Sequence, residues 1–352
     1  TPTAVVRLGL PATAAIPPMT GWPARLRAAI GERHYLCHGG YEYDGAELSA
    51  LVPDELRRAA FDIATARIRS VAVSSVFSPV NGTMEQEAAH ILRAEIPGLR
   101  VTCSHEFGRI GLLERENITI LNACLVDLAD HLAEALTTAL AEAAITAPLL
   151  LSQNDGTVMN SAYGRRYPAA TFASGPTNSM RGAGYLSKVA DCAVIDIGGT
   201  TTDVGVLTRG FPRESATVTE IAGIRTNWRI PDVLSLGIGG GSRVHDADRI
   251  GPDSVGFELT SKARVFGGDV LTATDLAVAA GQAQIGDPAL AGIDQGKARV
   301  ALSTIANRVA DAVDRMRTSP AALPVILVGG GSIVLPDTLP GLPDVQRPDH
   351  FD

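Results

Sequence analysis

The sequence contains few aromatic residues, few cysteines and no long apolar run. Aromatic residues make up 5% of the 352 residues, whereas glycine occurs 36 times. This combination disfavours an all-β sandwich and is typical of α/β chains with aliphatic cores and tight turns. The cysteines lie far apart and form no CxxC pair, so the sequence predicts neither a zinc site nor a disulfide framework. They are Cys37, Cys103, Cys124 and Cys192.

The chain also lacks an excess of basic residues. Lysine and arginine number 30 against 38 aspartates and glutamates, a formal net charge of -8, which disfavours nucleic acid and anionic membranes as general partners. No stretch reaches the ~20 apolar residues of a membrane helix, and the start has no signal-peptide layout. We therefore expect a cytoplasmic protein. Because the chain begins with threonine, we also expect it to be the inside of a longer protein.

Hydrophobic residues make up 45% of the chain and charged residues 19%, which predicts a globular protein with a sizeable core. The length suggests about two domains. We expect them over residues 1–170 and 171–352, because proline and glycine interrupt the pattern between residues 164 and 176. Prolines between residues 2 and 23 predict an irregular segment over residues 1–50.

Alternating strand and helix signals predict an α/β architecture in both halves. Apolar, β-branched runs indicate strands, and periodic stretches rich in leucine and alanine indicate helices. In the first half we expect helices over 53–69, 84–94 and 112–144, and strands over 70–77, 99–104 and 149–153, the last of them buried. In the second half we expect an antiparallel meander over 191–197, 204–208 and 215–223, helices over 272–281 and 295–318, and a buried strand from residue 325.

The most specific motif is DIGGTTTDVGVL, which starts at Asp196. A strand delivers Asp196 to its end, Gly198 and Gly199 allow close backbone approach, and the threonines offer hydroxyl and amide donors. Such a hairpin can hold phosphate oxygens. A carboxylate beside phosphate needs a divalent cation, so Asp196 or Asp203 is a candidate magnesium ligand. The alternative is an ordinary tight hairpin whose turn is capped by Asp and Thr.

Two further glycine runs follow strand signals. VILVGGGS ends at Ser332, and glycines at the end of such a strand form a surface on which a nucleotide can lie, although they can also form a loose loop. LGIGGGS, residues 236–242, is a phosphate loop or a flexible turn. Asp269 and Asp275 are candidates for magnesium or substrate, but we favour Thr272 followed by Asp275 as a helix cap.

Other polar clusters leave two interpretations open. Ser174, Gly175 and Thr177 begin a predicted helix that suits an anion or is simply capped. We interpret the charged residues between His105 and Glu116 as salt bridges at a helix start. His38 is weak evidence for substrate contact. These clusters do not resemble a Ser-His-Asp triad or a metal-binding His cluster, which excludes the zinc mechanism of classical cyclic amidases.

The chain resembles the hydantoinase/oxoprolinase family, A-type, within the superfamily of actin, sugar kinases and heat-shock chaperone ATPases. The glycine motifs resemble that superfamily's second phosphate loop and adenosine loop. The segments that carry the narrower resemblance span nearly the whole chain in order. They are SHEFGRIGLLERENITILNA from Ser104, LLLSQNDGTVM from Leu149, FASGPTNSMRGA from Phe172, DIGGTTTD from Asp196, LSLGIGGGSRV from Leu234 and VFGGDVLTATDLAVAAG from Val265.

The resemblance implies two ribonuclease-H-like, actin-like α/β domains with a cleft between them that holds ATP and Mg2+. It implies that Asp196 and Asp203 are catalytic and that Asp196 is a metal ligand. The implied ATP-binding residues are Gly198, Gly199, Thr200, Thr201, Gly239, Gly240, Gly329, Gly330, Gly331 and Ser332. Family members begin with a first phosphate loop of the form Asp-x-Gly-Gly-Thr, which nothing before Asp196 matches. We therefore expect the first domain to lack its N-terminal strands and this chain alone to be inactive.

The implied function is ATP-dependent hydrolysis of a cyclic amide such as hydantoin, 5-oxoproline or a related lactam, through phosphorylation of the ring carbonyl. The implied partner is a B-type subunit, and the chain is a possible homo-oligomer. One alternative is a subunit of an ATP-dependent ketone carboxylase. Another is a non-catalytic actin-like nucleotide-binding protein. The sequence leaves open the exact substrate and what His38, His105 and Asp275 do.

Overall fold

The computed structural model describes residues 1–215, 219–319, 321, 323–342 and 344–349. The chain divides into two compact units. Unit 1 comprises Thr1–Phe172 and Ala216–Ile230, and unit 2 comprises Ala173–Ser215 and Pro231–Asp352. The second segment of unit 1 thus lies inside the sequence range that we expected for the second domain. That these units are two actin-like domains with a cleft stays a prediction.

Unit 1 is built on a sheet of parallel strands in the order β2-β1-β3-β4. The strands are β1 (Thr3–Leu10), β2 (His34–His38), β3 (Ser70–Ser75) and β4 (Arg100–Cys103). Every residue of β3 is buried, as are all those of β1 except Leu10. Such near-continuous burial is typical of parallel strands that helices cover on both faces.

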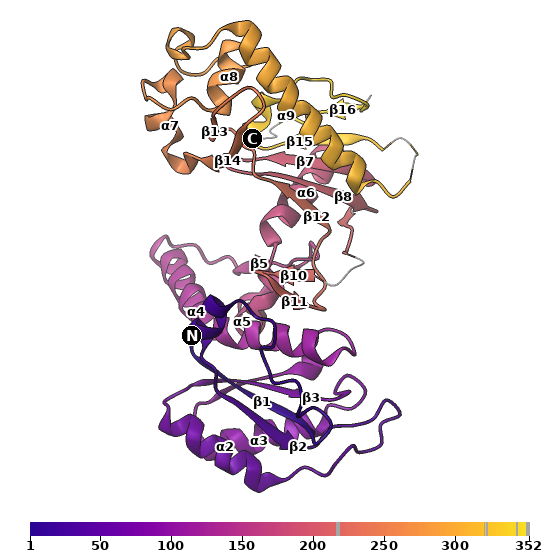
Figure 1. Cartoon of the computed structure of the whole chain (residues 1–352). Helices are drawn as coiled ribbons and strands as arrows, with labels where there is room; N and C mark the ends of the chain where they lie inside the picture. Colours follow the sequence, from indigo (N-terminus) through magenta and orange to yellow (C-terminus); the bar gives the residue numbers. More distant parts are fainter. Residues whose placement is uncertain (216–218, 320, 322, 343, 350–352) are drawn as a thin grey trace. The chain divides into compact units, whose positions relative to one another are not determined.

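Helices cover both faces of this sheet. The helices of unit 1 are α1 (Ala24–Ile30), α2 (Pro53–Thr65), α3 (Thr83–Glu95), α4 (Leu112–Glu142) and α5 (Ser161–Arg166), of which α2, α3 and α4 pack on the sheet. Figure 1 shows α2 and α3 on one face and α4 on the other. The side chains of β1 alternate accordingly, because Val6 and Leu8 join the core beneath α2 and α3, whereas Val5 joins the core beneath α4.

The prediction of an irregular segment over residues 1–50 is wrong. The segment contains β1, which lies between Pro2 and Pro11, and β2. Proline is tolerated at strand ends because it removes only its own donor there. The prolines were therefore boundaries of a strand rather than signs of irregular structure.

Two other strand predictions need correction. The expected strand over 149–153 forms β5 (Leu150–Ser152), but β5 pairs with β6 (Val158–Asn160) in a small hairpin, and Leu150 is 54% exposed. The described part of the segment 215–223 forms β10 (Thr219–Ile221), which pairs with β11 (Ile224–Thr226) in unit 1 instead of continuing a meander. Residues 216–218 lie outside the described residues.

Unit 2 is built on a mixed sheet in the order β12-β8-β7-β15-β16, with β9 also paired to β8. β7 and β8 form an antiparallel hairpin, whereas β15 runs parallel to β7. The strands are β7 (Cys192–Ile197), β8 (Thr202–Thr208), β9 (Phe211–Pro212), β12 (Val233–Leu236), β15 (Val325–Val328) and β16 (Val345–Gln346). A separate hairpin joins β13 (Ser242–Val244) to β14 (Ile250–Ser254).

The two faces of this sheet are covered by different helices. α9 (Gln295–Met316) and α8 (Ala273–Ala279) share the larger core with one face, and α6 (Ser174–Ser187) packs on the other. A short helix, α7 (Leu259–Lys262), lies in the connection before α8. The expected helices over 272–281 and 295–318 and the buried strand from residue 325 are thus present, with ends within a few residues of those predicted.

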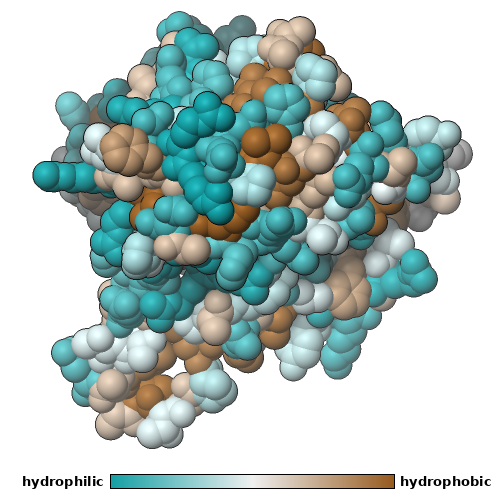
Figure 2. All heavy atoms as spheres, turned by 90° about the horizontal axis from the view of Figure 1, so that it is seen from below, coloured by the Kyte–Doolittle hydropathy of each residue, from teal (hydrophilic) through white to brown (hydrophobic). Residues whose placement is uncertain are grey.

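None of the described helices combines the length and the apolar character that a membrane crossing needs. On the face shown in Figure 2, hydrophobic residues form small groups among hydrophilic ones.

Candidate functional site

The hairpin between β7 and β8 carries the most specific sequence motif. Its turn is closed by a hydrogen bond from the Gly198 amide to the Thr201 carbonyl, with the two atoms 2.9 Å apart. Gly199, Thr200 and Thr201 are exposed at the tip of this turn. Their amides and hydroxyls are therefore the accessible part of the motif, which suits contact with an anion.

A second glycine loop packs under the hairpin turn. The Gly240 amide donates to the Gly198 carbonyl at 3.0 Å, and the Gly241 amide donates to the Gly199 carbonyl at 2.7 Å. A Cβ at Gly239 would lie 2.5 Å from the Thr200 nitrogen, which is closer than atoms can approach without displacement. Gly239 and Gly240 are buried. They thus hold the turn in place from below rather than forming its exposed surface.

The third glycine loop follows β15 and reaches the same place. Because β15 pairs with β7 in parallel, Val328 lies opposite Asp196, and the glycines after it adjoin the start of the hairpin turn. A Cβ at Gly331 would overlap the Gly198 carbonyl oxygen, and one at Gly329 would overlap an Asp196 carboxylate oxygen. Gly329 also has a φ of 89°, which glycine adopts without strain.

The structure thus brings together the glycine-rich segments that the sequence places about 130 residues apart. Gly330 is exposed beside this junction, whereas Ser332 is fully buried and its hydroxyl accepts a hydrogen bond from Arg347 at 3.3 Å. Of the predicted residues on this third loop, Gly330 is therefore the exposed one. That these residues bind ATP stays a prediction.

The three glycine loops meet at one place, which we call the glycine junction. Two carboxylates lie next to it. Asp196 and Asp203 are opposite one another in the β7–β8 register, and both are half-buried. Burial raises the pKa of Asp203, and the charge of Asp196 raises it further, while a hydrogen bond from the Ser235 hydroxyl opposes both. Two neighbouring carboxylates form a place where a divalent cation would be stabilising.

Asp275 has a structural position. Its carboxylate accepts hydrogen bonds from the Thr272 amide and the Val265 amide, each at 2.7 Å, and the Thr272 hydroxyl completes a capping box. The prediction that Thr272 caps this helix is confirmed. The cap also adjoins the site, because the Thr274 amide and hydroxyl both donate to the Gly240 carbonyl at 2.9 Å. Asp269 is exposed in the loop before it.

The predicted helix start near Ser174 is present, since α6 begins there. The residue before it, Ala173, has a left-handed backbone and no side-chain cap. Binding of an anion at this helix end stays a prediction.

The two histidines left open by the sequence have matching surroundings in unit 1. His38 ends β2, and its Nδ1 lies 2.8 Å from Glu55, which is in the first turn of α2. His105 follows β4, and its Nδ1 lies 2.8 Å from Glu85, which is in the first turn of α3. In both cases the backbone amide of the histidine donates to the same glutamate at 2.8 Å. The sequence contained a signal for these pairs, because each glutamate lies in the first turn of a predicted helix and each histidine lies at or just after the end of a strand.

Sequence reasoning missed one cluster with metal-ligand chemistry, made by Glu85, Cys103 and His105, whose ligand atoms lie within 4.8 Å of one another. Both carboxylate oxygens of Glu85 already accept hydrogen bonds, one from the Ser104 hydroxyl and one from His105. Burial raises the pKa of the Cys103 thiol to about 12, with the charge of Glu85 adding to the effect. A protonated thiol and an occupied carboxylate indicate a hydrogen-bonded network rather than a metal centre.

The interpretation of the charged residues from His105 to Glu116 as salt bridges at a helix start is confirmed for Glu106 and Glu116, which pair with Arg166 and Arg7. Arg115 and Glu116 are buried. Glu116 accepts two hydrogen bonds from the guanidinium of the fully buried Arg7, at 2.7 and 2.5 Å, and one from the Ser74 hydroxyl at 2.6 Å. Arg115 donates to the Ser104 hydroxyl and to the carbonyls of Ile110 and Ser75. These charges join strands to helix α4.

The comparisons with known proteins agree with the sequence resemblance. Residues 115–323 match the hydantoinase/oxoprolinase family model, and residues 5–96 match the model of the hydantoinase/oxoprolinase N-terminal region. The first match alone covers more than half of the chain. The protein belongs to the hydantoinase/oxoprolinase family.

Two relatives have named activities. The chain is 27% identical over 278 residues to the caprolactamase subunit alpha of Pseudomonas jessenii, a match that covers 77% of this chain and 38% of the relative. It is 26% identical over 247 residues to the acetone carboxylase beta subunit of Xanthobacter autotrophicus, which covers 66% of this chain and 34% of the relative. The chain thus spans between a third and two fifths of the length of these relatives.

Two solved structures share the fold. The ATP-dependent caprolactamase from Pseudomonas jessenii matches with a TM-score of 0.73 at 20% identity, over 94% of this chain and 54% of that one. The nucleotide-free structure of an acetone carboxylase matches with a TM-score of 0.63 at 19% identity, over 95% of this chain and 54% of that one. These matches establish a mixed α/β fold of the kind these enzymes have.

Proposed function

We propose that this chain is part of an ATP-dependent hydrolase of cyclic amides and carries one of its phosphate-binding surfaces. The observation that carries the proposal is the junction of three glycine loops in unit 2. Glycines converge there so closely that added Cβ atoms would overlap backbone atoms, and the exposed tip from Gly199 to Thr201 remains free of bulky side chains. A backbone of this kind can approach phosphate oxygens closely.

The residues present fit ATP and a magnesium ion. The exposed turn supplies hydroxyl and amide donors for phosphate oxygens, and Asp196 with Asp203 supplies the oxygen ligands that magnesium prefers, directly or through water. Fixed donors of this kind need no reorganisation when charge develops on the phosphates. ATP would supply the phosphoryl group that activates the ring carbonyl of the amide. The residues of this chain would hold the phosphates in position and neutralise charge.

The substrate class and the partner rest on the family and its relatives. A cyclic amide is resonance-stabilised, so its opening gains from phosphorylation of the carbonyl oxygen. One relative is a caprolactamase subunit and the other a carboxylase subunit, and both names imply assembly with other chains. We infer that this protein acts with a B-type subunit that receives the activated intermediate.

An ATP-dependent ketone carboxylase is the second candidate. It is favoured by the acetone carboxylase beta subunit, which is nearly as similar to this chain as the caprolactamase subunit is. Both reactions begin with phosphoryl transfer to an oxygen, so the glycine junction serves either one.

Phosphate release separates these candidates. The full-length protein is mixed with its B-type subunit and magnesium-ATP, and phosphate is measured with hydantoin, with 5-oxoproline, with acetone and bicarbonate, or with no addition. We expect release that depends on a cyclic amide. Release that depends on the ketone identifies the carboxylase, and release that ignores all additions points to a nucleotide-binding switch protein. The 352-residue chain alone should bind ATP weakly and release no phosphate. Rapid release by it would show that its own glycine loops are sufficient for turnover.

A matched pair of variants tests the site itself. Asp196→Asn removes a charge at the glycine junction and should lower substrate-dependent turnover by ~100-fold or more, as loss of single charge-stabilising groups does elsewhere. Asp191→Asn is the control, because Asp191 is exposed at the opposite end of the same hairpin, where it accepts a hydrogen bond from the Arg209 amide. Equal turnover of both variants would contradict the proposed site.

A further inference from the structure

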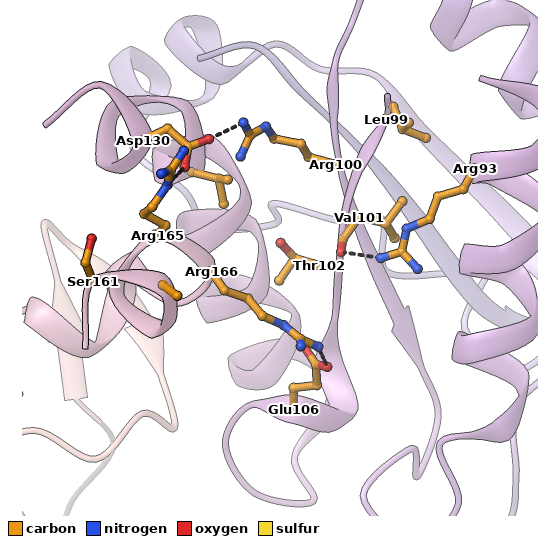
Figure 3. A pocket seen from close by; sticks show the side chains of 12 residues that line it. Arg93, Leu99, Arg100, Val101, Thr102, Glu106, Asp130, Ser161, Arg165 and Arg166 are labelled. Carbon is orange, nitrogen blue, oxygen red and sulfur yellow. Dashed lines mark hydrogen bonds and ion pairs between the residues drawn. The ribbon is translucent and has the colours of Figure 1, made fainter. Parts of the chain in front are cut away.

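Unit 1 contains a pocket of about 640 Å³ whose wall is rich in arginine. Arg93 comes from α3, Arg100 from β4, and Arg165 and Arg166 from the end of α5. We call it the arginine pocket, and Figure 3 shows these side chains around it. The pocket lies in a different unit from the glycine junction. It therefore needs an explanation of its own.

Each guanidinium in the pocket is fixed by one of its neighbours. Asp130 pairs with both Arg100 and Arg165, which approach its carboxylate from different elements (Figure 3). Burial alone would raise the pKa of Asp130, but the hydrogen bonds from Arg165 and Arg100 lower it, so this carboxylate is firmly ionised.

The other two arginines are fixed by other neighbours. Arg166 pairs with Glu106, and Arg93 donates to the Val101 carbonyl at 3.2 Å. An arginine has five N–H donors in a rigid plane, and the interactions described here use only some of them. The remaining donors are preorganised for another acceptor.

The charge balance of the wall favours an anion. The protein as a whole has a net charge of -8, yet the pocket wall holds four arginines against Asp130 and Glu106. Asp127 and Glu134 also pair with Arg100 and Arg165, at 3.4 and 3.3 Å, but Arg93 contacts only a backbone carbonyl among the described residues. Among the described residues Arg93 therefore has no carboxylate partner that offsets its charge. Such a guanidinium on a concave surface attracts anions.

The geometry points to the arginine pocket as a binding site for a small molecule that carries phosphate or carboxylate groups. Guanidinium groups bind both kinds of oxyanion through paired hydrogen bonds, and the volume is within the ~300–1,000 Å³ of small-molecule sites. Thr102 and Ser161 place hydroxyl groups in the same wall. The inference does not depend on the proposed function, because no residue of the glycine junction takes part.

Calorimetric titration of the chain with inorganic pyrophosphate and, separately, with succinate at low, constant ionic strength and without magnesium tests the inference. We expect at least one of these anions to bind, and the arm that does so identifies the group recognised. Arg93→Gln and Arg166→Gln should each weaken that binding by roughly tenfold, which is the usual effect of losing one charge-assisted interaction. Both side chains are exposed, so neither substitution should disturb folding.

The control is Arg58→Gln. Arg58 is also exposed on a helix of unit 1 and, like Arg93, donates to a backbone carbonyl at 3.2 Å. Arg58→Gln removes one positive charge, as the two pocket variants do, but Arg58 does not line the pocket. Hydrogen exchange with bound anion should show protection over β4 and α5. Failure of both anions to bind, an equal effect of Arg58→Gln, or protection confined to residues 198–201 would each overturn the inference.

Discussion

The two units connect the strands of their central sheets to the neighbouring elements in different ways. In unit 1, buried charged side chains join the sheet to α4, as the pair of Arg7 and Glu116 shows. In unit 2, backbone atoms of glycine loops contact each other directly, as Gly331 and Gly198 do. Large buried side chains thus hold the sheet of unit 1 in place, whereas the close backbone contacts of unit 2 are possible because glycine has no side chain.

The difference predicts opposite sensitivities. A network of buried charges fails when atoms are removed, because the remaining partner is left buried and unpaired. A junction of glycines fails when atoms are added, because the backbone has no room to move. The stability of unit 1 therefore depends on both partners of its buried ion pair, whereas the stability of unit 2 depends on glycines that leave room for backbone contacts.

Arg7→Met should destabilise unit 1 by ~3–5 kcal/mol, the usual result of removing one partner from a buried ion pair. Glu116 would remain fully buried without its guanidinium partner. Urea unfolding followed by tryptophan fluorescence measures the effect, because the chain's two tryptophans, Trp22 and Trp228, both belong to unit 1.

Two further variants make this prediction specific. Adding Glu116→Leu to Arg7→Met should restore a large part of the lost stability, since an apolar pair replaces an unpaired charge. Arg57→Met, which breaks the exposed pair with Asp54, should change the stability very little. If Arg7→Met were as mild as Arg57→Met, the buried pair would not hold unit 1 together.

Gly331→Ala should destabilise unit 2 by ~1–3 kcal/mol, the range found for overpacked sites. The new Cβ would overlap the Gly198 carbonyl oxygen and lie 2.8 Å from the Ile197 side chain. Far-UV circular dichroism in urea measures the stability, and faster hydrogen exchange over β7 and β8 should show where the junction opens.

Gly330→Ala is the matched control for this substitution. A Cβ at Gly330 meets no atom within 4 Å, so the same chemical change one residue earlier should leave stability almost unaltered. Equal losses from both variants would mean that the effect comes from glycine flexibility rather than from the contact with Gly198.

His105 should give unit 1 a small pH dependence. The hydrogen bond to Glu85 raises the pKa of His105, burial opposes this, and the charges of Glu85 and Glu106 raise it against a smaller opposite effect of Arg166. A pKa above the unfolded value of 6.5 means that the stabilisation is complete below pH 6.5 and is lost as the pH rises through the folded-state value. His105→Gln should therefore cost more stability at acidic than at alkaline pH.

Unfolding in urea at about pH 5.5 and about pH 9 measures this difference. His90→Gln is the control, because His90 is exposed on α3 and lacks a carboxylate partner among the described residues. A loss from His105→Gln that is the same at both pH values would show that only packing, and not the ionised pair, stabilises unit 1.

The sequence predicted most elements that have a strong local pattern. The helices that start at Pro53 and Leu112, the β7–β8 hairpin and the Thr272 cap follow from periodicity, glycine position and capping chemistry. That the glycine loops meet was expected from the resemblance to the superfamily. The structure supplies the reason, because the parallel strands β7 and β15 end at the same edge of the sheet. What these loops bind remains a prediction from the family.

The failures occurred where contacts distant in sequence decide the structure. Arg7 interrupts an apolar run, and its pairing with Glu116 explains how a charged side chain can be buried in β1. The hairpin of β10 and β11 leaves unit 2 because Ile224 joins the core of unit 1. The arginine pocket was not predictable either, since its residues come from three separate parts of the chain.

The return of residues 216–230 to unit 1 limits how this protein can be divided. A cut at residue 172 would leave unit 2 with a hairpin whose Ile224 has lost its apolar surroundings. The structure also offers a remedy, because Glu214 and Pro231 form a β-bridge and the Asp232 amide donates to the Arg213 carbonyl at 2.7 Å. The residues that flank the segment 216–230 are therefore neighbours. A short turn that replaces this segment would make unit 2 a continuous polypeptide suited to separate expression.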